Sequence, residues 1–173
     1  MGIYAFEGRR PRIDDTAYVS PAALIIGDVV VGKECFIGHN VCIKGDYGSV
    51  VIGDYTNVQE NCVIHARPGE KAVIGDWVTI GHGAVIHGAE IRDWAIIGMS
   101  SVVSDHSVVG PWAVIAEGAV VVNGTNIPGE TISVGIPAKP KGTIDEEFKS
   151  KWIPVKEEYR SLSKRYKENL VPL

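Results

Sequence analysis

Residues 85–121 read VIHGAEIRDWAIIGMSSVVSDHSVVGPWAVIAEGAVV, and an aliphatic side chain returns in this stretch at every sixth position. The aliphatic positions are Val85, Ile91, Ile97, Val103, Val109, Ile115 and Val121. The fourth residue after each of the first six is small, at Ala89, Ala95, Ser101, Ser107, Ala113 and Ala119. A period of six matches neither the about 3.6 residues of a helical turn nor the two-residue repeat of a strand, so it indicates a unit of one short strand and one corner.

The same phase occupies most of the chain before this stretch. It runs through Ile13, Val19, Ile25, Val31, Ile37 and Ile43, and it resumes at Ile52, Val58, Ile64, Ile74 and Ile80. Three units close one triangular coil, and stacked coils pair as parallel strands about 4.8 Å apart. A β-sandwich with evenly spaced strands does not explain an aliphatic residue that stays in phase for so long. We therefore predict an all-β solenoid over residues 1–142, with a lead-in strand at its N-terminus.

A helical tail is predicted for residues 143–173. Thr143 and Glu146 have the spacing of a capping box, and Pro154 suits the first turn of a helix over residues 155–169. Apolar side chains follow helical spacing at Tyr159, Leu162, Tyr166 and Leu170. Because such a stripe is typical of a helix with one buried face, we expect the tail to pack along the solenoid.

The composition of the 173 residues limits the possible partners. Lys and Arg total 17 against 21 Asp and Glu, which gives a formal charge of −4, and no basic cluster could follow a phosphate backbone. The N-terminus lacks the pattern of a signal peptide, and no apolar run approaches the about 20 residues of a membrane span. Cys35, Cys42 and Cys62 form no Cys-x-x-Cys pair and are interpreted as reduced thiols. We expect a cytoplasmic protein that binds neither nucleic acid nor membranes.

Two insertions interrupt the period. The step from Ile43 to Ile52 is nine residues and the step from Ile64 to Ile74 is ten, whereas an unbroken unit has six. Counting faces around the triangle places the units that begin at Ile43, Ile64 and Val85 on one face, on successive coils. Because insertions in a solenoid emerge at corners and often carry function, chemistry is expected in this region.

Three of the five histidines, His65, His82 and His87, fall within 23 residues. On this grid His65 and His87 share a face, whereas His82 lies on another face of a triangle whose side is about 16 Å. Zinc needs imidazole nitrogens only about 3.3 Å apart, so one chain can supply His65 and His87 while His82 must come from a neighbouring copy. This arrangement predicts a homotrimer with a metal site at each interface. His39 and His106 are interpreted as ordinary surface residues.

Further polar residues fall near these histidines. Lys44 and Asp46 open the first insertion on the face of His65, and Gln59 lies one coil from His82. Taken singly, each is explained equally well by a structural role and by a role in a site. The structural role is a solvated turn for Lys44 and Asp46 and an exposed strand position for Gln59. Their convergence at one interface favours a role in orienting the metal ligands and bound water.

Several short motifs resemble the signature of γ-class carbonic anhydrases and their close relatives. They are Asn57-Val58-Gln59, the six-residue step from Gln59 to His65, and residues 80–88, IGHGAVIHG. Residues 134–139, VGIPAK, are similar as well, although hexapeptide acyltransferases share that element. The resemblance covers nearly the whole chain and implies a left-handed parallel β-helix over residues 11–136.

The resemblance also implies a site. In that family three histidines bind zinc, or iron or cobalt, between the subunits of a trimer, and they correspond here to His65, His82 and His87. The residues that position the metal-bound water would be Gln59 and Asp46, with Asn57 beside them. A tyrosine of the terminal helix often reaches the site in the shorter relatives, and Tyr159 is the best candidate for it.

The chain departs from this family pattern in three places. Lys44-Gly45-Asp46 stands where the family has Arg-x-Asp, so a flexible point charge replaces a planar guanidinium. Tyr47 replaces a glutamate, and the acidic loop of the family shrinks to the turn at residues 67–70. These departures resemble a subgroup near phenylacetate and carnitine metabolism, for which acyl thioesters are alternative substrates.

The function implied by the resemblance is the metal-dependent hydration of CO2 to bicarbonate by a metal-bound hydroxide. Three alternatives stay open: hydrolysis of an acyl-CoA thioester, hexapeptide acyl transfer with a histidine as general base, and metal binding at a silent site. Acyl transfer needs no metal, so metal analysis separates it from the other hypotheses. An assay of CO2 hydration separates the first hypothesis from the silent site.

Overall fold

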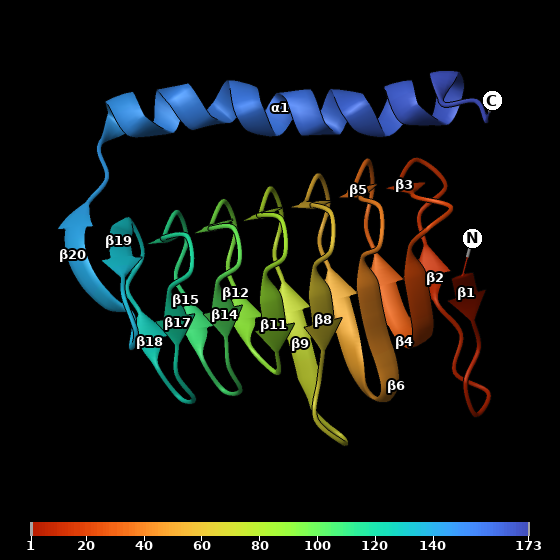
Figure 1. Ribbon diagram of the computed structural model, residues 1–173, viewed down its shortest axis with the longest axis horizontal. Helices are drawn as coiled ribbons and strands as arrows, with labels where there is room; N and C mark the ends of the chain where they lie inside the picture. The colour runs from red at the N-terminus through yellow and green to blue at the C-terminus, as the bar shows by residue number, and fades with distance from the viewer. Residues whose placement is uncertain (1, 173) are drawn as a thin grey trace.

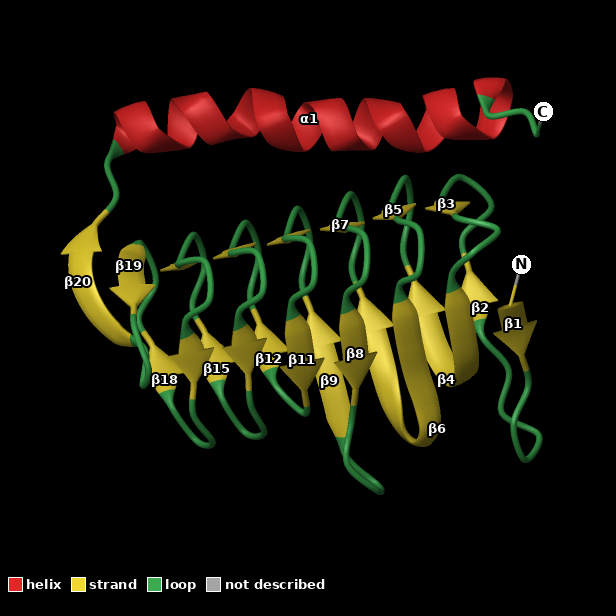
Figure 2. Ribbon diagram, viewed as in Figure 1, coloured by secondary structure: helices red, strands yellow, loops and turns green. Residues whose placement is uncertain are grey.

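The computed structural model describes residues 2–172, which form a parallel β-solenoid with one long helix laid along its side (Figures 1 and 2). The chain winds around a triangle, so that each coil contributes one strand to each of three faces. We call them the first, second and third face, in the order in which the chain visits them after Pro21. The predicted fold is confirmed in its class and in its C-terminal helix.

The strands of the three faces stack in parallel. The first face contains the N-terminal halves of β4 (Leu24–Val31) and β6 (Cys42–Ile52), then β8 (Val63–His65), β11 (Val85–His87), β14 (Val102–Val103) and β17 (Val120–Val121). The second face contains β2 (Arg12–Ile13), the C-terminal halves of β4 and β6, β9 (Lys71–Ile74), β12 (Glu90–Ile91), β15 (Val108–Val109) and β18 (Asn126–Ile127). The third face contains β3 (Tyr18–Val19), β5 (Phe36–Ile37), β7 (Asn57–Val58), β10 (Thr79–Ile80), β13 (Ile96–Ile97), β16 (Val114–Ile115) and β19 (Thr131–Val134).

Two strands cover the ends of the stack. At the N-terminal end β1 (Gly2–Tyr4) pairs with β4 in parallel. At the C-terminal end β20 (Lys139–Thr143) pairs with β19 and runs antiparallel to it. These strands supply hydrogen-bond partners to the edge of the first face at the N-terminal end and to the edge of the third face at the C-terminal end.

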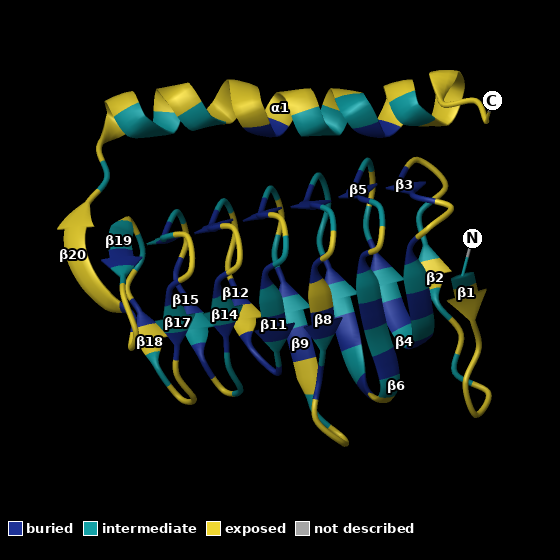
Figure 3. Ribbon diagram, viewed as in Figure 1, coloured by how far each residue is buried: buried dark blue, intermediate teal, exposed yellow. Residues whose placement is uncertain are grey.

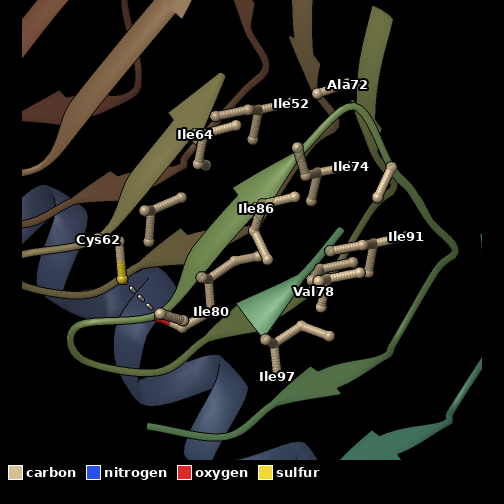
Figure 4. Close-up of a cluster of buried hydrophobic side chains, with 14 of the residues drawn as sticks. Ile52, Cys62, Ile64, Ala72, Ile74, Val78, Ile80, Ile86, Ile91 and Ile97 are labelled. Atoms are coloured by element: carbon tan, nitrogen blue, oxygen red, sulfur yellow. Dashed lines mark hydrogen bonds between the residues drawn. The ribbon is translucent and has the colours of Figure 1, made fainter. Parts of the chain in front are cut away.

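The aliphatic period builds the core. The side chains of Ile64, Ile80 and Ile97 are fully buried, and Figure 4 shows them pointing into the interior, the first two from one coil and Ile97 from the next. The phase near residue 85 differs from the sequence prediction by one position, because Ile86 is buried and pairs with Ile64 while Val85 points outward. The core positions are therefore Ile80, Ile86 and Ile91, so a step of six residues is followed by one of five. Positions 85 and 86 are both aliphatic, so the pattern alone cannot choose between them.

Most corners of the triangle contain a residue in the left-handed backbone region. At the corner before the third face, this residue is aromatic on four successive coils, with φ between 56° and 64° at Tyr55, Trp77, Trp94 and Trp112. The rings stack with centroids 4.7, 5.0 and 5.0 Å apart. Contacts between neighbouring aromatic rings stabilise the corner and compensate for a backbone conformation that is unfavourable for large residues.

The two insertions take different forms. The first is absorbed in β6, an eleven-residue strand that continues from the first face to the second. Gly45, at the bend of β6, packs against Gly27 of β4. A side chain at either position would collide with the opposing backbone, so glycine is required at both. The second insertion forms an exposed turn at residues 67–69. Only this second insertion emerges from the solenoid as a loop.

The helix α1 (Glu146–Asn169) starts earlier than the sequence predicts. Asp145 caps it, because its carboxylate accepts a hydrogen bond from the Phe148 backbone NH at 2.8 Å, so the expected capping box at Thr143 is wrong. Pro154 lies inside the helix on its exposed side and not in its first turn. Among residues 2–172, no helix combines the length and apolar character that crossing a membrane requires.

The helix packs on one column of outward side chains from the third face, and Figure 3 shows buried positions along its lower side. The paired residues of this column are Tyr18, Phe36, Asn57, Thr79, Ile96, Val114 and Ile132. At one end Tyr166 packs on Tyr18 and Phe36, with ring centroids 5.1 and 5.3 Å apart. At the other end Phe148 and Trp152 lie beside the aliphatic residues. The middle of this column is polar, and it adjoins the candidate site.

Candidate functional site

Lys44, His65 and His87 stand in one column on the first face. Strand pairing places Lys44 beside His65, and His65 beside His87, on three successive coils. The two imidazole rings are nearly perpendicular, with centroids 5.1 Å apart. The prediction that His65 and His87 approach each other from one face is therefore confirmed by the geometry of the chain.

Asp46 joins two members of this column. Its carboxylate lies 2.9 Å from Lys44 Nζ and 2.9 Å from His65 Nε2. Burial alone would raise the pKa of Asp46, but the hydrogen bonds from Lys44 and His65 lower it to about 2. Asp46 is therefore an anion that orients the imidazole of His65. The ring of Tyr47 packs on the other side of His65, with centroids 4.8 Å apart.

Asp105 plays the corresponding role at His87, and the sequence analysis did not find it. His87 Nδ1 lies 2.5 Å from Asp105 Oδ1, and Arg67 Nε donates to the other carboxylate oxygen at 3.0 Å. Burial opposes ionisation, yet the bonds and charges of His87 and Arg67 lower the pKa of Asp105. Asp105 follows His87 by 18 residues, but strand pairing aligns Ile86 with Val103, so Asp105 stands one position beyond the residue that stacks on His87. A coil count from His87 therefore leads to the corner that carries Asp105 but does not identify this residue.

His82 lies on the corner between the third and first faces and is paired with Glu60. Its Nδ1 is 2.8 Å from Glu60 Oε2, and both side chains are partly exposed. The five residues from His82 to His87 run along the width of the first face, a distance of about 16 Å. Among the residues that the structure describes, no three His, Cys, Asp or Glu side chains form a cluster that could hold a metal ion. One chain thus brings His65 and His87 together and leaves His82 apart.

Gln59 and Asn57 belong to a buried polar chain beside His82. Gln59 Nε2 donates to Asn57 Oδ1 at 3.2 Å, and Asn57 Nδ2 donates to Thr79 Oγ1 at 2.9 Å. The chain ends at Lys156 of α1, whose Nζ donates to Thr79 Oγ1 at 3.2 Å and to the Trp77 carbonyl at 2.7 Å. Burial lowers the pKa of Lys156 to about 7. Sequence reasoning missed Lys156, because the period of the solenoid does not encode the register of the helix.

Tyr159 lies on the solenoid side of α1, but the contacts that the structure gives it lead away from the histidines. Its ring packs on Phe36, with centroids 5.7 Å apart. Burial raises the pKa of Tyr159, and the nearby charge of Glu60 adds to the effect. Tyr159 therefore comes near the carboxylate partner of His82 without a direct bond to any of the three histidines within residues 2–172.

The donor set fits a divalent metal such as zinc, iron or cobalt. Each of the three histidines has one ring nitrogen on a carboxylate, and its other ring nitrogen makes no hydrogen bond to a described residue. A carboxylate on the distal nitrogen is the arrangement that orients metal-ligating imidazoles. The free nitrogens are Nδ1 of His65 and Nε2 of His82 and His87. Three neutral imidazoles suit these ions, provided that two copies of the chain contribute.

The fold and the six-residue period define a hexapeptide-repeat, left-handed β-helix protein, and comparisons with known proteins agree. A candidate acetyltransferase from Bacillus cereus superposes with a TM-score of 0.94, 34% identity and 96% coverage of both chains. A hexapeptide transferase family protein from Anaplasma phagocytophilum gives a TM-score of 0.91 at 32% identity, covering 95% of this chain and 98% of that one. No family model matches the chain.

A curated relative narrows the assignment further. The carnitine operon protein CaiE of Escherichia coli (strain K12) is 36% identical over 158 residues, which are 91% of this chain and 81% of that protein. The chain belongs to the CaiE family of hexapeptide-repeat proteins. The resemblance to proteins of carnitine metabolism is thereby confirmed. These three relatives are named for a carnitine operon or for group transfer, and not for carbonic anhydrase activity.

Proposed function

We propose that this protein is a CoA-thioester-dependent acyl-transfer enzyme in which a histidine–carboxylate pair removes the proton of the acyl acceptor. The observation that carries the proposal is the pairing of His65, His82 and His87 with Asp46, Glu60 and Asp105, which leaves one ring nitrogen of each histidine free. Such a carboxylate fixes the imidazole tautomer and stabilises the imidazolium that forms on proton uptake. The names of the two structural relatives above support acyl transfer as the reaction class.

The proposed reaction follows general base catalysis. An amine or hydroxyl acceptor gives its proton to a free imidazole nitrogen while its heteroatom attacks the thioester carbonyl carbon. The carbon–sulfur bond then breaks, and the CoA thiolate takes the proton back from the imidazolium. When water is the acceptor, the same steps hydrolyse the thioester. Lys44, which Asp46 holds at 2.9 Å beside His65, supplies a positive charge near the developing oxyanion.

A homotrimer is part of the proposal. His82 is separated from His65 and His87 by the width of the first face, so a site with all three histidines requires two copies of the chain. Cyclic threefold symmetry would repeat the same contact three times and leave no unpaired surface. Each interface would then join Asp46, His65, His87 and Asp105 of one chain to Gln59, Glu60 and His82 of its neighbour.

Metal-dependent CO2 hydration is the second candidate, and the carboxylate on each histidine favours it. His65 and His87 of one chain with His82 of another would hold a zinc, iron or cobalt ion. Such an ion, when bound, lowers the pKa of a water ligand to about 7. The residues of this chain would orient the reactants, Asp46 by accepting a hydrogen bond and Gln59 through its amide.

Paired assays on one preparation test these proposals. CoA release from acetyl-CoA is measured with a reagent that reacts with the free thiol. We expect this release to depend on an added amine or hydroxyl acceptor and to persist after metal ions are removed with a chelator. The His82→Ala variant should lose about 100-fold or more of this activity. His39→Ala is the matched control, because His39 occupies the equivalent corner of the third face two coils earlier.

The outcomes separate the two functions. CO2 hydration that disappears with the metal, without thioester activity, would replace acyl transfer by the second candidate. Equal losses in His82→Ala and His39→Ala would contradict the assignment of the site. A mass in solution of about three times 18.6 kDa supports the trimer, and an active monomer overturns it.

A further inference from the structure

A groove of about 370 Å³ runs between α1 and the third face. Ile96, Val114 and Ile132 form its floor on three successive coils, and Phe148 and Trp152 of the helix form one wall. The strands β10, β13, β16 and β19 are separated by three inter-strand distances of about 4.8 Å, so the groove follows the solenoid axis for about 14 Å. Aliphatic and aromatic side chains thus line most of its length, and the exposed Glu117 is also part of its lining.

Polar groups converge at one end of this groove. His82, Gln59 and Thr79 line it there, and Glu60 holds His82 through Nδ1 at 2.8 Å. The Gln59 amide is fixed by Asn57, and Lys156 bonds to Thr79 from the helix. An apolar cavity with a few convergent polar groups at one end is the usual form of a small-molecule site.

We propose that this groove binds the apolar acyl group of a thioester substrate, with the carbonyl end held beside His82 and Gln59. The inference rests on the proposed function and names its substrate class: acyl groups several carbons longer than acetyl. The pantetheine arm of CoA is a poor occupant, because its two amides would lose their hydrogen bonds to water among Ile96, Val114 and Trp152. An alkyl or aryl group loses nothing there.

A larger hollow elsewhere does not compete for this role. It measures about 470 Å³ and lies at the N-terminal end of the solenoid, between Ile13, Tyr18 and Leu170. Its lining includes Asp14 and Lys167 but none of the paired histidines or amides. Of these two cavities, the groove lined by Trp152 is the one that joins apolar side chains to a histidine–carboxylate pair.

Buried apolar area sets the expected gain in affinity as the acyl chain becomes longer. Each methylene that enters the groove contributes about 0.8 kcal/mol, which is about a fourfold gain in affinity. Hexyl-CoA should therefore bind at least about tenfold more tightly than ethyl-CoA. These S-alkyl thioethers cannot transfer an acyl group, so titration calorimetry measures their binding whether or not the protein is an acyltransferase.

Val114→Phe tests the groove by filling its floor. In this variant we expect the affinity ratio of hexyl-CoA to ethyl-CoA to fall to about two. The matched control is Val108→Phe, because Val108 is the equivalent half-buried outward residue one unit earlier, on β15 of the second face. Val108→Phe should keep the ratio of the wild type. If Val114→Phe does not fold, Trp152→Ala removes a wall instead and should lower the same ratio.

The outcomes distinguish this inference from the proposed function. A ratio near one in the wild type, or the same ratio in both Val variants, overturns the groove as an acyl site even if acetyl-CoA is consumed. A chain-length effect that Val114→Phe abolishes, without any CoA release from acyl-CoA, supports the groove and removes the proposed function. Dissociation of the assembly by Val114→Phe alone would show that a second copy covers the groove, and would also overturn the inference.

Discussion

The coils of residues 85–121 and those of residues 42–82 share one core but carry different outward faces. The later coils contain no insertion and keep the six-residue period from Ile91 onward, and they expose mainly corner turns and short aliphatic strands. The earlier coils contain both insertions and carry Lys44, Asp46, Gln59, Glu60, His65 and His82. His87 and Asp105 join the site because they stack one coil above an earlier partner. The regular coils therefore provide the structural framework, and the coils with insertions supply most of the residues of the candidate site.

The largest effect is expected from a matched pair of core substitutions, one in each of these two regions. Ile64 and Ile91 are both fully buried, one in each region. Ile64→Ala and Ile91→Ala should each lower the free energy of unfolding by about 2–5 kcal/mol, because each leaves a cavity. Only Ile64→Ala should also lower activity per folded molecule, since His65 follows it directly. Denaturant unfolding together with activity assays checks both effects, and equal activity losses would contradict the division.

Lys156 gives the next largest effect, and it depends on pH. Burial lowers its pKa to about 7 in the folded chain from 10.5 in water, and the atoms that accept from its Nζ are two carbonyls and a hydroxyl, which do not titrate in this range. Between these two pH values the unfolded chain binds one more proton, so the contribution of Lys156 to the free energy of unfolding is complete above about pH 10.5 and is lost progressively as the pH falls from 10.5 to 7. Between pH 7 and 9 the wild type should gain about 3 kcal/mol relative to Lys156→Met. Parallel curves would mean that Lys156 keeps an ordinary pKa.

Asp46→Asn should lower the activity of the candidate site and leave the fold of the solenoid intact. The amide keeps the shape of the carboxylate but loses the charge that orients His65 and pairs with Lys44. Loss of such an orienting partner typically costs about 10–100-fold in activity or metal affinity. Asp93→Asn is the control, because Asp93 accepts a hydrogen bond from the Asp76 backbone NH at the corner between the second and third faces, which carries none of the three histidines of the candidate site. Similar activity in both variants would remove Asp46 from the site.

The smallest effect concerns the start of the helix. Asp145→Ala removes the side chain that caps α1 at the Phe148 NH, so the unfolding free energy should fall by about 1 kcal/mol. Phe148 also lines the groove, and fraying of the first turn should therefore weaken the binding of hexyl-CoA more than that of ethyl-CoA. Thermal unfolding and calorimetry measure the two effects. A stabilised Asp145→Ala variant would contradict the cap.

The sequence predicts the solenoid and the shared face of His65 and His87, because the six-residue period is a count that needs no knowledge of side-chain packing. The same count leads to the corner that carries Asp105 but not to the residue itself, because the coil after His87 has 17 residues and not 18. It failed at Val85, where two adjacent aliphatic residues allow either phase. It also failed for the start of α1, because Asp145 competes with Thr143 as a cap. Lys156 could not be found this way, since its partners lie 61–79 residues away and the helix register is set by packing.

The most direct test of the account mixes two inactive chains. Co-expressed His65→Ala and His82→Ala chains should recover about a quarter of the wild-type CoA-release activity, because random assembly pairs an intact His65–His87 side with an intact His82 in about one interface of four. Co-expressed His65→Ala and His87→Ala chains should stay inactive, since every interface then lacks a histidine of the first face. Equal recovery in the two mixtures, or none in the first, would contradict a site shared between His65 and His87 of one chain and His82 of its neighbour.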